Sequence, residues 1–535
     1  MNRKTRTMLR KGTAILSAML ILSGCKDANN SSEKVVQENI QADSITELTV
    51  MLYDRGNIPT NQGVINDNRW TKYINEEVEK LGLHVKFIPV SRSDEGQKVP
   101  VMMTSGTAAD IMMSYDIGTV QRFHKDGGTW ELSEYIEECG PNLKAYIGDD
   151  VLVKGKDEEG NQFAIPARRS TTARTNAFIR MDWLNKLEMA VPTTPDELYD
   201  VLWAFKYENP DGLQPNEVVG LQQFNISKEM LANCFWQETD ERSVFINSEC
   251  DSAGALAAGD PGYRDYMRFR NKLYNDGLMD SEYFTDLGYG QKANELFVKG
   301  KLGYYEYHVN GNVDVMRGGL LQTLKQSIPE AEMVSIPPLK NIHDGKIYNS
   351  QDSNSAAFLF IPKTAKDPAA CIKYLDWLAT KEGGFTIWHG IEGEHFEMQG
   401  QVPAVLDAQK NAVEKDWIRD DLFLVGNGGY FITEADYIAC KVLENAEYSN
   451  YIQNNFDNAT MGEAISSYGY MSPTQAKEAA NLKKVNNEYS VKVSTCKTDE
   501  FDAMFDEWAA ALEKYNIQQI KEERASYYDN FFSKQ

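Results

Sequence analysis

The sequence predicts an α/β fold in which parallel strands are flanked by helices. Residues 47–52 have the apolar pattern of a strand, residues 70–82 that of an amphipathic helix, and residues 85–89 that of a second strand. A helical segment around Met102 leads to a third short strand at 109–113. This alternation builds a parallel sheet with helical faces. Ligands of such sheets bind beyond the carboxyl ends of the strands, which indicates the loops at 53–57 and 114–116.

A second series of helix and strand patterns follows Arg180. Thr194 is a suitable N-cap for a helix that begins with Pro195. With 535 residues the chain is long enough for about two or three domains, and from about residue 406 its pattern is mostly helical. The predicted helices are 181–187, 195–205, 263–274, 368–379 and 501–515, and the predicted strands are 218–224, 301–307 and 353–361.

The charge of the chain argues against nucleic acid as a partner. The formal net charge is −24, and the acidic residues are spread along the sequence. Such a field repels nucleic-acid phosphates and anionic lipid headgroups. A neutral ligand fits better, unless a local group of Arg and Lys overrides the average.

The N-terminus has the pattern of a bacterial lipoprotein signal. A basic run without acids at residues 3–11 precedes a short apolar segment at 12–22, which ends in small residues before Cys25. The apolar segment is too short for a permanent membrane helix, and the residues before Cys25 look like a lipobox. We therefore predict a signal peptide over residues 1–24, then a lipidated Cys25 and a polar tether over residues 25–45. Such a protein lies outside the cytoplasm, on the outer face of the cell membrane.

The remaining cysteines favour free thiols over disulfides. None of them forms a C-x-x-C pair, and a chain of this length has ample core without covalent links. An even number in an exported protein leaves the disulfide alternative open. These cysteines are Cys139, Cys234, Cys250, Cys371, Cys440 and Cys496.

An ordered set of short segments resembles a known family. In chain order they are 102–106 (MMTSG), 110–111 (DI), 140–144 (GPNLK), 163–166 (FAIP), 179–184 (IRMDWL), 192–198 (PTTPDEL), 272–278 (KLYNDGL) and 390–396 (GIEGEHF). The set is similar to the lipid-anchored members of the extracellular solute-binding protein family 1, the receptors of sugar-type ABC importers in bacteria. The match runs from about Leu48 to the last helix. The order of the segments is specific, although no single motif is decisive.

The resemblance implies a two-lobe α/β fold of the periplasmic-binding-protein kind. Hinge-linked sheets are flanked by helices, and the ligand lies in a cleft that closes between the lobes. By this analogy the first lobe comprises residues 46–166 and 337–405. The second lobe comprises residues 167–336 and a helical C-terminal part, 406–535.

The stretch WHGIEGEHFEM at 388–398 contains two histidines and three glutamates. A zinc motif such as H-x-x-E-H fails because residue 393 is glycine, and two glycines make a continuous helix improbable. A pair of catalytic carboxylates is not excluded by spacing alone. The favoured interpretation is a structural turn after a helix. Contact of Trp388 or Glu394 with ligand in the cleft is the second.

Aromatic and polar residues in the expected cleft loops are candidate ligand contacts. Aromatic rings stack on the C–H faces of sugars, and polar groups satisfy the hydroxyls. For each aromatic residue the alternative is packing in the core. The candidates are Tyr53, Arg55, Trp70, Asp116, Arg168, Arg169, Gln223, Tyr305, Tyr307, Asp352, Trp388 and Glu394.

Arg168 and Arg169, with Arg174 and Arg180 nearby, form a local excess of positive charge. They could bind the carboxylate of a uronic-acid oligosaccharide. The alternative, which we favour, is that they offset neighbouring acidic residues at the hinge.

The loop at 209–217 occupies the place where alginate-binding relatives carry a calcium loop similar to an EF-hand. Here Asn209, Asp211 and Glu217 are weak calcium candidates, because Leu213 stands where an oxygen ligand is needed and the loop is one residue short. We expect a surface loop without metal, and no cofactor.

Together these observations predict a non-enzymatic lipoprotein that delivers a carbohydrate, in particular an oligosaccharide, to an ABC permease with a separate ATPase. The chain has no phosphate-binding loop and no G-x-S-x-G motif. A secreted carbohydrate-active enzyme and a peptide receptor on the same fold are the alternatives.

Overall fold

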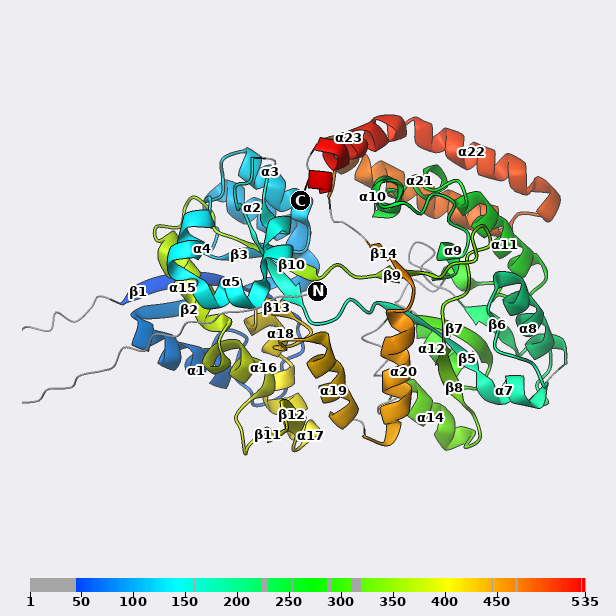
Figure 1. The fold of residues 1–535 in the computed structure, drawn as a ribbon, viewed down its shortest axis with the longest axis horizontal. Helices are drawn as coiled ribbons and strands as arrows, with labels where there is room; N and C mark the ends of the chain where they lie inside the picture. The colour runs from blue at the N-terminus through cyan, green and yellow to red at the C-terminus, as the bar shows by residue number, and fades with distance from the viewer. Residues whose placement is uncertain are drawn as a thin grey trace, which may run out of the picture. The chain divides into compact units, whose positions relative to one another are not determined.

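Two large hydrophobic cores organise the chain from residue 45 onward. The helices and strands that carry them are labelled in Figure 1. The computed structural model describes residues 45–157, 159–208, 210–222, 230–252, 254–285, 291–308, 319–444, 446–466, 470–530 and 532–534. The predicted signal peptide, Cys25, the tether, Asn209 and Gln223 lie outside these residues. Residues 45–535 form one compact unit.

The first core is built on the predicted strand-helix-strand unit. Strands β1 (Thr46–Asp54) and β2 (Leu83–Ser91) pair in parallel, with Thr46 opposite Leu83 and Asp54 opposite Ser91. Helix α1 (Arg69–Val78) connects them and buries Trp70, Ile74 and Val78, because these apolar residues share one face of the helix. The Asn68 side chain caps this helix by accepting hydrogen bonds from the backbone N–H groups of Trp70 and Thr71.

A four-stranded sheet with the order β13-β4-β10-β3 completes the first core. Its strands are β3 (Met112–Ser114), β4 (Ile165–Arg169), β10 (Ser355–Phe360) and β13 (Gly426–Asn427). The helices of this half are α2 (Glu95–Ser105), α3 (Ile117–Lys125), α4 (Ser133–Cys139), α5 (Pro141–Ile147), α6 (Asp149–Leu152), α15 (Pro368–Leu378), α16 (Thr386–His389), α17 (Ala408–Asn411) and α18 (Arg419–Leu422). A hairpin of β11 (Phe396–Gln399) and β12 (Val402–Val405) follows α16.

The second core contains a mixed sheet with the order β6-β7-β5-β8. Strand β5 (Thr175–Arg180) is antiparallel to both β7 (Leu302–His308) and β8 (Met333–Ile336), and β6 (Val219–Gln222) is parallel to β7. The helices of this half are α7 (Met181–Lys186), α8 (Pro195–Tyr207), α9 (Met230–Asn233), α10 (Glu241–Ser252), α11 (Tyr263–Asn275), α12 (Gln291–Val298), α14 (Leu320–Ser327), α20 (Ser449–Ala459), α21 (Pro473–Thr495), α22 (Phe501–Glu513) and α23 (Ile517–Asn530).

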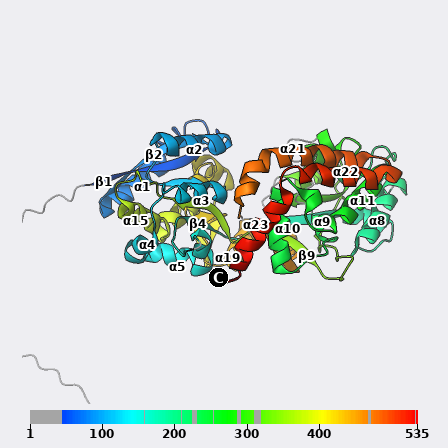
Figure 2. The ribbon, with the colours of Figure 1, turned by 90° about the horizontal axis from the view of Figure 1, so that it is seen from above.

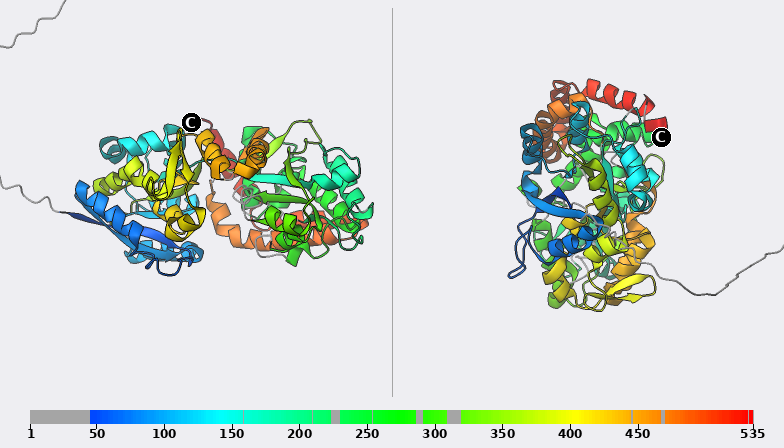
Figure 3. Two further views of the ribbon diagram at one scale, coloured as in Figure 1. Left: turned by 90° about the horizontal axis from the view of Figure 1, so that it is seen from below. Right: turned by 90° about the vertical axis from the view of Figure 1, so that its left-hand side faces the viewer.

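The C-terminal helices belong to the second half of the molecule. Helices α21 and α22 run beside each other in Figure 2, and Leu482, Val493, Phe505 and Trp508 on them are part of the second core. In the left panel of Figure 3 these orange and red helices lie against the green segments that carry the second sheet. The C-terminal helices therefore complete the second core, whose first strand along the chain is β5.

The chain passes between the two cores more than once, as the resemblance implies. It leaves the first core between β4 and β5 and returns between β8 and β10, by way of β9 (Tyr348–Gln351). It leaves again through α19 (Glu434–Glu444) towards α20, and β14 (Glu463–Ser466) then pairs in parallel with β9. These connecting segments are the candidate hinges.

The lobe boundary expected at residue 405 does not coincide with the end of the first core. Residues Trp417 to Val425 belong to the first core, and β13 pairs with β4 of the first sheet. The reason is that an apolar run, with Phe423 and Val425 fully buried, follows the β11–β12 hairpin and returns to the first core. By this packing, the C-terminal part of the second lobe begins after Val425 and not after residue 405.

Among the described residues, none of the helices combines the length and the apolar character needed to cross a membrane. Five of the six cysteines after Cys25 are free thiols, and the side chain of Cys250 lies outside the described part.

Candidate ligand-binding site

Three adjoining cavities share the rings of Tyr470 and Tyr527. Their volumes are about 210, 300 and 540 Å³, and the first is lined by residues of both halves of the molecule. Gln121 and Lys156 also line both the first and the second cavity. The shared lining makes them successive parts of one groove, which suits an extended ligand.

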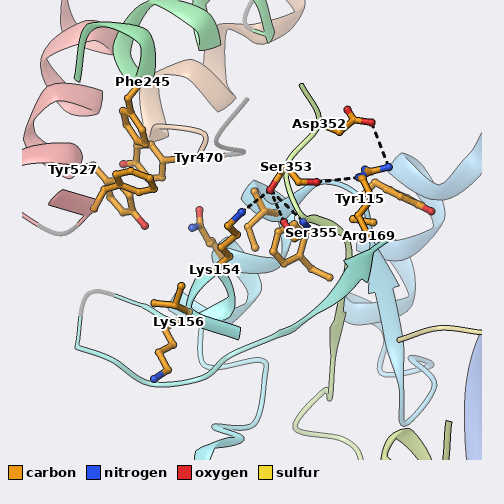
Figure 4. A pocket seen from close by; sticks show the side chains of 16 residues that line it. Tyr115, Lys154, Lys156, Arg169, Phe245, Asp352, Ser353, Ser355, Tyr470 and Tyr527 are labelled. Atoms are coloured by element: carbon orange, nitrogen blue, oxygen red, sulfur yellow. Dashed lines mark hydrogen bonds and ion pairs between the residues drawn. The ribbon is translucent and has the colours of Figure 1, made fainter. Parts of the chain in front are cut away.

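Four aromatic side chains line the first cavity from the second half of the molecule (Figure 4). We call Phe245, Tyr470, Tyr527 and Phe532 the aromatic group. The rings of Tyr470 and Tyr527 are stacked, with centroids 3.7 Å apart and planes 14° apart. Because Phe245 is buried on α10 and lies 6.1 Å from Tyr527, nearly parallel to it, the half-buried tyrosines have a fixed base. Partly exposed parallel rings of this kind suit the apolar faces of sugars.

A buried arginine helps to hold the aromatic group. Arg524 on α23 is fully buried and donates a 2.6 Å hydrogen bond to the carbonyl oxygen of Phe245. Its guanidinium lies 4.8 Å from the Phe245 ring, at a cation–π distance. It also donates to the carbonyl oxygen of Tyr470. One side chain therefore joins α10, α23 and the segment before α21.

The first half of the molecule supplies polar groups to the same cavity. The Arg169 guanidinium donates to the Ser353 carbonyl oxygen at 3.1 Å and to Asn427 Oδ1 at 3.0 Å, and it lies 3.5 Å from an Asp352 carboxylate oxygen. Lys154 Nζ donates to Ser353 Oγ at 2.7 Å. The groove thus has an aromatic side and a hydrogen-bonding side, which is the arrangement that carbohydrate binding requires.

Of the predicted contact residues, the structure brings Arg169 and Asp352 to the first cavity. Tyr115, from the loop indicated at 114–116, lines it as well. Asp116 instead caps α3, where its carboxylate accepts hydrogen bonds from the Gly118 backbone N–H and the Thr119 hydroxyl. Gln223 lies outside the described residues.

Four predicted aromatic contacts pack inside the protein, which is the alternative that the sequence left open. Trp70 and Tyr53 are each 1 % exposed in the first core, and Tyr305 is fully buried beside the half-buried Tyr307. Trp388 is 5 % exposed under the guanidinium of Arg419. Rings so enclosed have almost no surface to offer a ligand.

Two predicted arginines bind groups of the protein itself. Arg55 forms a bidentate pair with the buried Asp421, with Nε 2.7 Å and Nη2 2.8 Å from carboxylate oxygens. Arg168 donates to the carbonyl oxygens of Tyr146 and Ile432. Arg174 lies 3.7 Å from Asp352, whereas both partners of Arg168 named here are carbonyl oxygens. The favoured expectation, that these arginines offset neighbouring acidic residues at the hinge, stays a prediction.

The stretch at 388–398 forms a turn between α16 and β11. Glu394, His395 and Glu414 bring ligand atoms together in a way that could hold a metal ion. The two carboxylates already face cations, however. Arg69 donates two 2.8 Å hydrogen bonds to Glu394 and lies 3.5 Å from Glu414, and Lys410 lies 3.5 Å from Glu394. The Arg69 hydrogen bonds lower the pKa of Glu394 to about 2, so the cluster is an ion-pair network.

The carboxylates of the weak calcium candidate also face cations. Asp211 accepts hydrogen bonds from Arg180 at 2.9 Å and Trp183 Nε1 at 2.7 Å, and it pairs with Lys186. Glu217 pairs with Lys301 at 3.0 Å. The Asp211 and Glu217 carboxylates are thus paired with different basic residues of the protein.

Sequence reasoning missed Tyr470, Tyr527 and Lys154. The two tyrosines are 57 residues apart along the chain, and Lys154 comes from the other core. Their approach depends on how α10, α21 and α23 pack, so no local pattern signals it. Aromatic residues close to the ends of the last helices were the available hint.

The fold and the groove define the class of protein: two α/β halves joined by crossing segments, with a cavity lined from both. Residues 65–385 match the family described as bacterial extracellular solute-binding protein, and the chain belongs to that family.

Several known proteins resemble the chain over much or nearly all of its length. It is 23 % identical over 520 residues to the polygalacturonan/rhamnogalacturonan-binding protein YtcQ of Bacillus subtilis, covering 94 % of this chain and 95 % of that one. It is 25 % identical to the lipoprotein LipO of Bacillus subtilis over 62 % of this chain and 65 % of that one. A solved HMO-binding, ABC-transporter-associated solute-binding protein from Bifidobacterium longum infantis shares the fold, with a TM-score of 0.66 and 18 % identity, covering 91 % of this chain and 99 % of that one.

Proposed function

We propose that this protein is a lipid-anchored receptor that captures an oligosaccharide in the groove and delivers it to the permease of an ABC importer. The aromatic group facing hydrogen-bonding side chains across one groove carries the proposal. The name of YtcQ and the description of the Bifidobacterium protein, both carbohydrate-related, support it. Cys25 is the proposed site of lipidation, after cleavage of residues 1–24.

The binding step follows from the groove. A sugar ring placed against Tyr470 and Tyr527 exchanges water for an apolar face, and its hydroxyls bond to groups such as Ser355 and Asp352. Because the lining comes from both halves, a bound ligand stabilises their contact. No step of this process breaks a bond in the ligand. We therefore propose a non-enzymatic receptor, with a separate ATPase providing the energy of transport.

The first test is titration calorimetry with a panel of neutral and acidic oligosaccharides and short peptides, with product analysis of each mixture. Tyr527→Ala should weaken binding of the best sugar by about tenfold, since truncation of a central aromatic contact costs more than 1 kcal/mol. Trp203→Ala is the matched control, because Trp203 is a partly exposed aromatic residue on α8 outside the three cavities. Cleaved product, binding of peptides alone, or equal affinity of Tyr527→Ala and the parent protein would each contradict the proposal.

A further inference from the structure

Lys154 is an enclosed cation in the groove with only neutral groups as hydrogen-bond partners. Its ammonium donates to Ser353 Oγ at 2.7 Å and to Asn354 Oδ1. Among the described residues it forms no ion pair with a carboxylate. Burial is the main cause that lowers the pKa of Lys154 to about 8, whereas the charge of Asp150 raises it in part and the positive charge of Arg169 lowers it.

Asp150 acts on Lys154 without an ion pair between them in the described part of the chain. Asp150 raises the pKa of Lys154 at longer range, but its Oδ2 accepts a 2.8 Å hydrogen bond from Asn354 Nδ2. An ammonium has three donors, and the two contacts above use two of them. The third N–H has no partner among the residues that the structure describes.

Arg169, which also lines the first cavity, is already engaged by groups of the protein. Arg169 donates to the Ser353 carbonyl oxygen and to Asn427 Oδ1, and the Asp352 carboxylate 3.5 Å away already offsets its charge. In Figure 4 Lys154 points towards Ser353, with Tyr470 and Tyr527 on the opposite side of the cavity, whereas Lys156 points away. Lys154 is therefore placed to meet a group on a sugar that contacts the two tyrosines.

We propose that Lys154 binds a carboxylate of the ligand, and that the receptor prefers oligosaccharides that contain uronic acid. The inference rests on the proposed function. It adds the charge of the ligand and the residue that recognises this charge. A ligand carboxylate would accept a hydrogen bond from the third N–H of Lys154 and give this ammonium a directly bonded anionic partner, in a cavity where charge-assisted hydrogen bonds are strong. The net charge of −24 makes such a local cation necessary, because the average field repels an anionic sugar.

The test compares one sugar in two charge states. Trigalacturonate and its methyl ester are titrated into the parent protein, into Lys154→Met and into Lys98→Met. Lys98 is an exposed lysine on α2 outside the cavities, so its variant controls for the loss of one positive charge. The parent protein should bind the acid at least about tenfold more tightly than the ester. Lys154→Met should remove most of that preference, and Lys98→Met should keep it.

The outcomes separate this inference from the proposed function. If neutral oligosaccharides bind and the acid binds no better than its ester, the inference is overturned while the receptor function stands. If Lys154→Met keeps the preference for the acid over the ester, or weakens the binding of both equally, Lys154 does not recognise the carboxylate. If no oligosaccharide of the wider panel binds, the proposed function fails and this inference with it. The comparison of acid and ester in the parent protein decides the charge preference even if Lys154→Met does not fold.

Discussion

At the scale of single residues, His389 shows how burial controls charge. Its side chain lies 4.5 Å from the ring of Phe385 and 5.2 Å from that of Phe431, measured between centroids. Its Nε2 is 3.3 Å from the Tyr430 carbonyl oxygen. Burial among these aromatic rings lowers the pKa of His389 to about 3, so the folded protein holds the imidazole neutral at every physiological pH.

We expect His389 to make stability depend on pH between 7 and 5. An unfolded histidine binds a proton below about pH 6.5, whereas folded His389 does not until the pH approaches its lowered pKa. Its contribution to the free energy of unfolding is therefore complete above pH 6.5 and is lost as the pH falls. By pH 5 the loss reaches about 2 kcal/mol. His389→Phe, measured by urea unfolding at both pH values, should lack this part of the decrease.

The control for this experiment is the exposed His84, which pairs with Glu79 at the surface. His84→Gln should keep the pH dependence of the parent protein. An equal decrease in the parent protein and in His389→Phe would show that folded His389 is protonated like a free histidine.

At the scale of elements, local patterns in the sequence predicted several of the helices and strands. The predicted helix at 195–205 is α8 (Pro195–Tyr207), and the Thr194 side chain accepts a hydrogen bond from the Glu197 backbone N–H as a cap. The turn after α16 was also predicted, since Gly390 has φ +89° and a side chain there would meet the His395 ring. These features depend on neighbours within a few residues, which the sequence displays directly.

The candidate site was predicted less well, because its members meet only through packing over long distances. Alternation in the sequence cannot distinguish a tyrosine in a core, such as Tyr305, from one beside a cavity, such as Tyr470. Charge pattern alone selected Arg168 and Arg169, whose partners are backbone carbonyls and residues far along the chain. Lys154 became distinct only once its neighbours were known to be neutral.

The loop before β6 gives a second prediction at this scale. Because Asp211 and Glu217 face protein cations, we expect neither calcium nor EGTA to move the thermal midpoint by more than about 1 °C. Asp211→Asn should lower stability by about 1–3 kcal/mol, since the fully buried Arg180 loses a charge-assisted partner. Glu217→Gln, which removes an exposed pair, should have a much smaller effect. A calcium-dependent rise of several degrees in the parent protein would contradict this view of the loop.

At the scale of the whole molecule, two cores share one ligand groove. The first core contains β1, β2 and α15, and the second contains β5, α11 and the C-terminal helices. The cavity beside Tyr470 takes Lys154 and Arg169 from the first half and Tyr527 from the second. A ligand in the groove therefore adds contacts that each core lacks when it is free, and it couples their stabilities.

This coupling predicts a change in the shape of thermal unfolding. Without ligand, calorimetry should show two transitions, one for each half, because each half has a large hydrophobic core of its own. An oligosaccharide at about 100 times its dissociation constant adds roughly 2.7 kcal/mol to the state in which both halves are folded. The lower transition should then rise towards the upper one, because unfolding either half releases the ligand. In Tyr527→Ala the same sugar concentration should produce a smaller rise, whereas Trp203→Ala should respond as the parent protein does. If ligand raised only the upper transition, the groove would belong to one core alone, and capture between the two halves would be wrong.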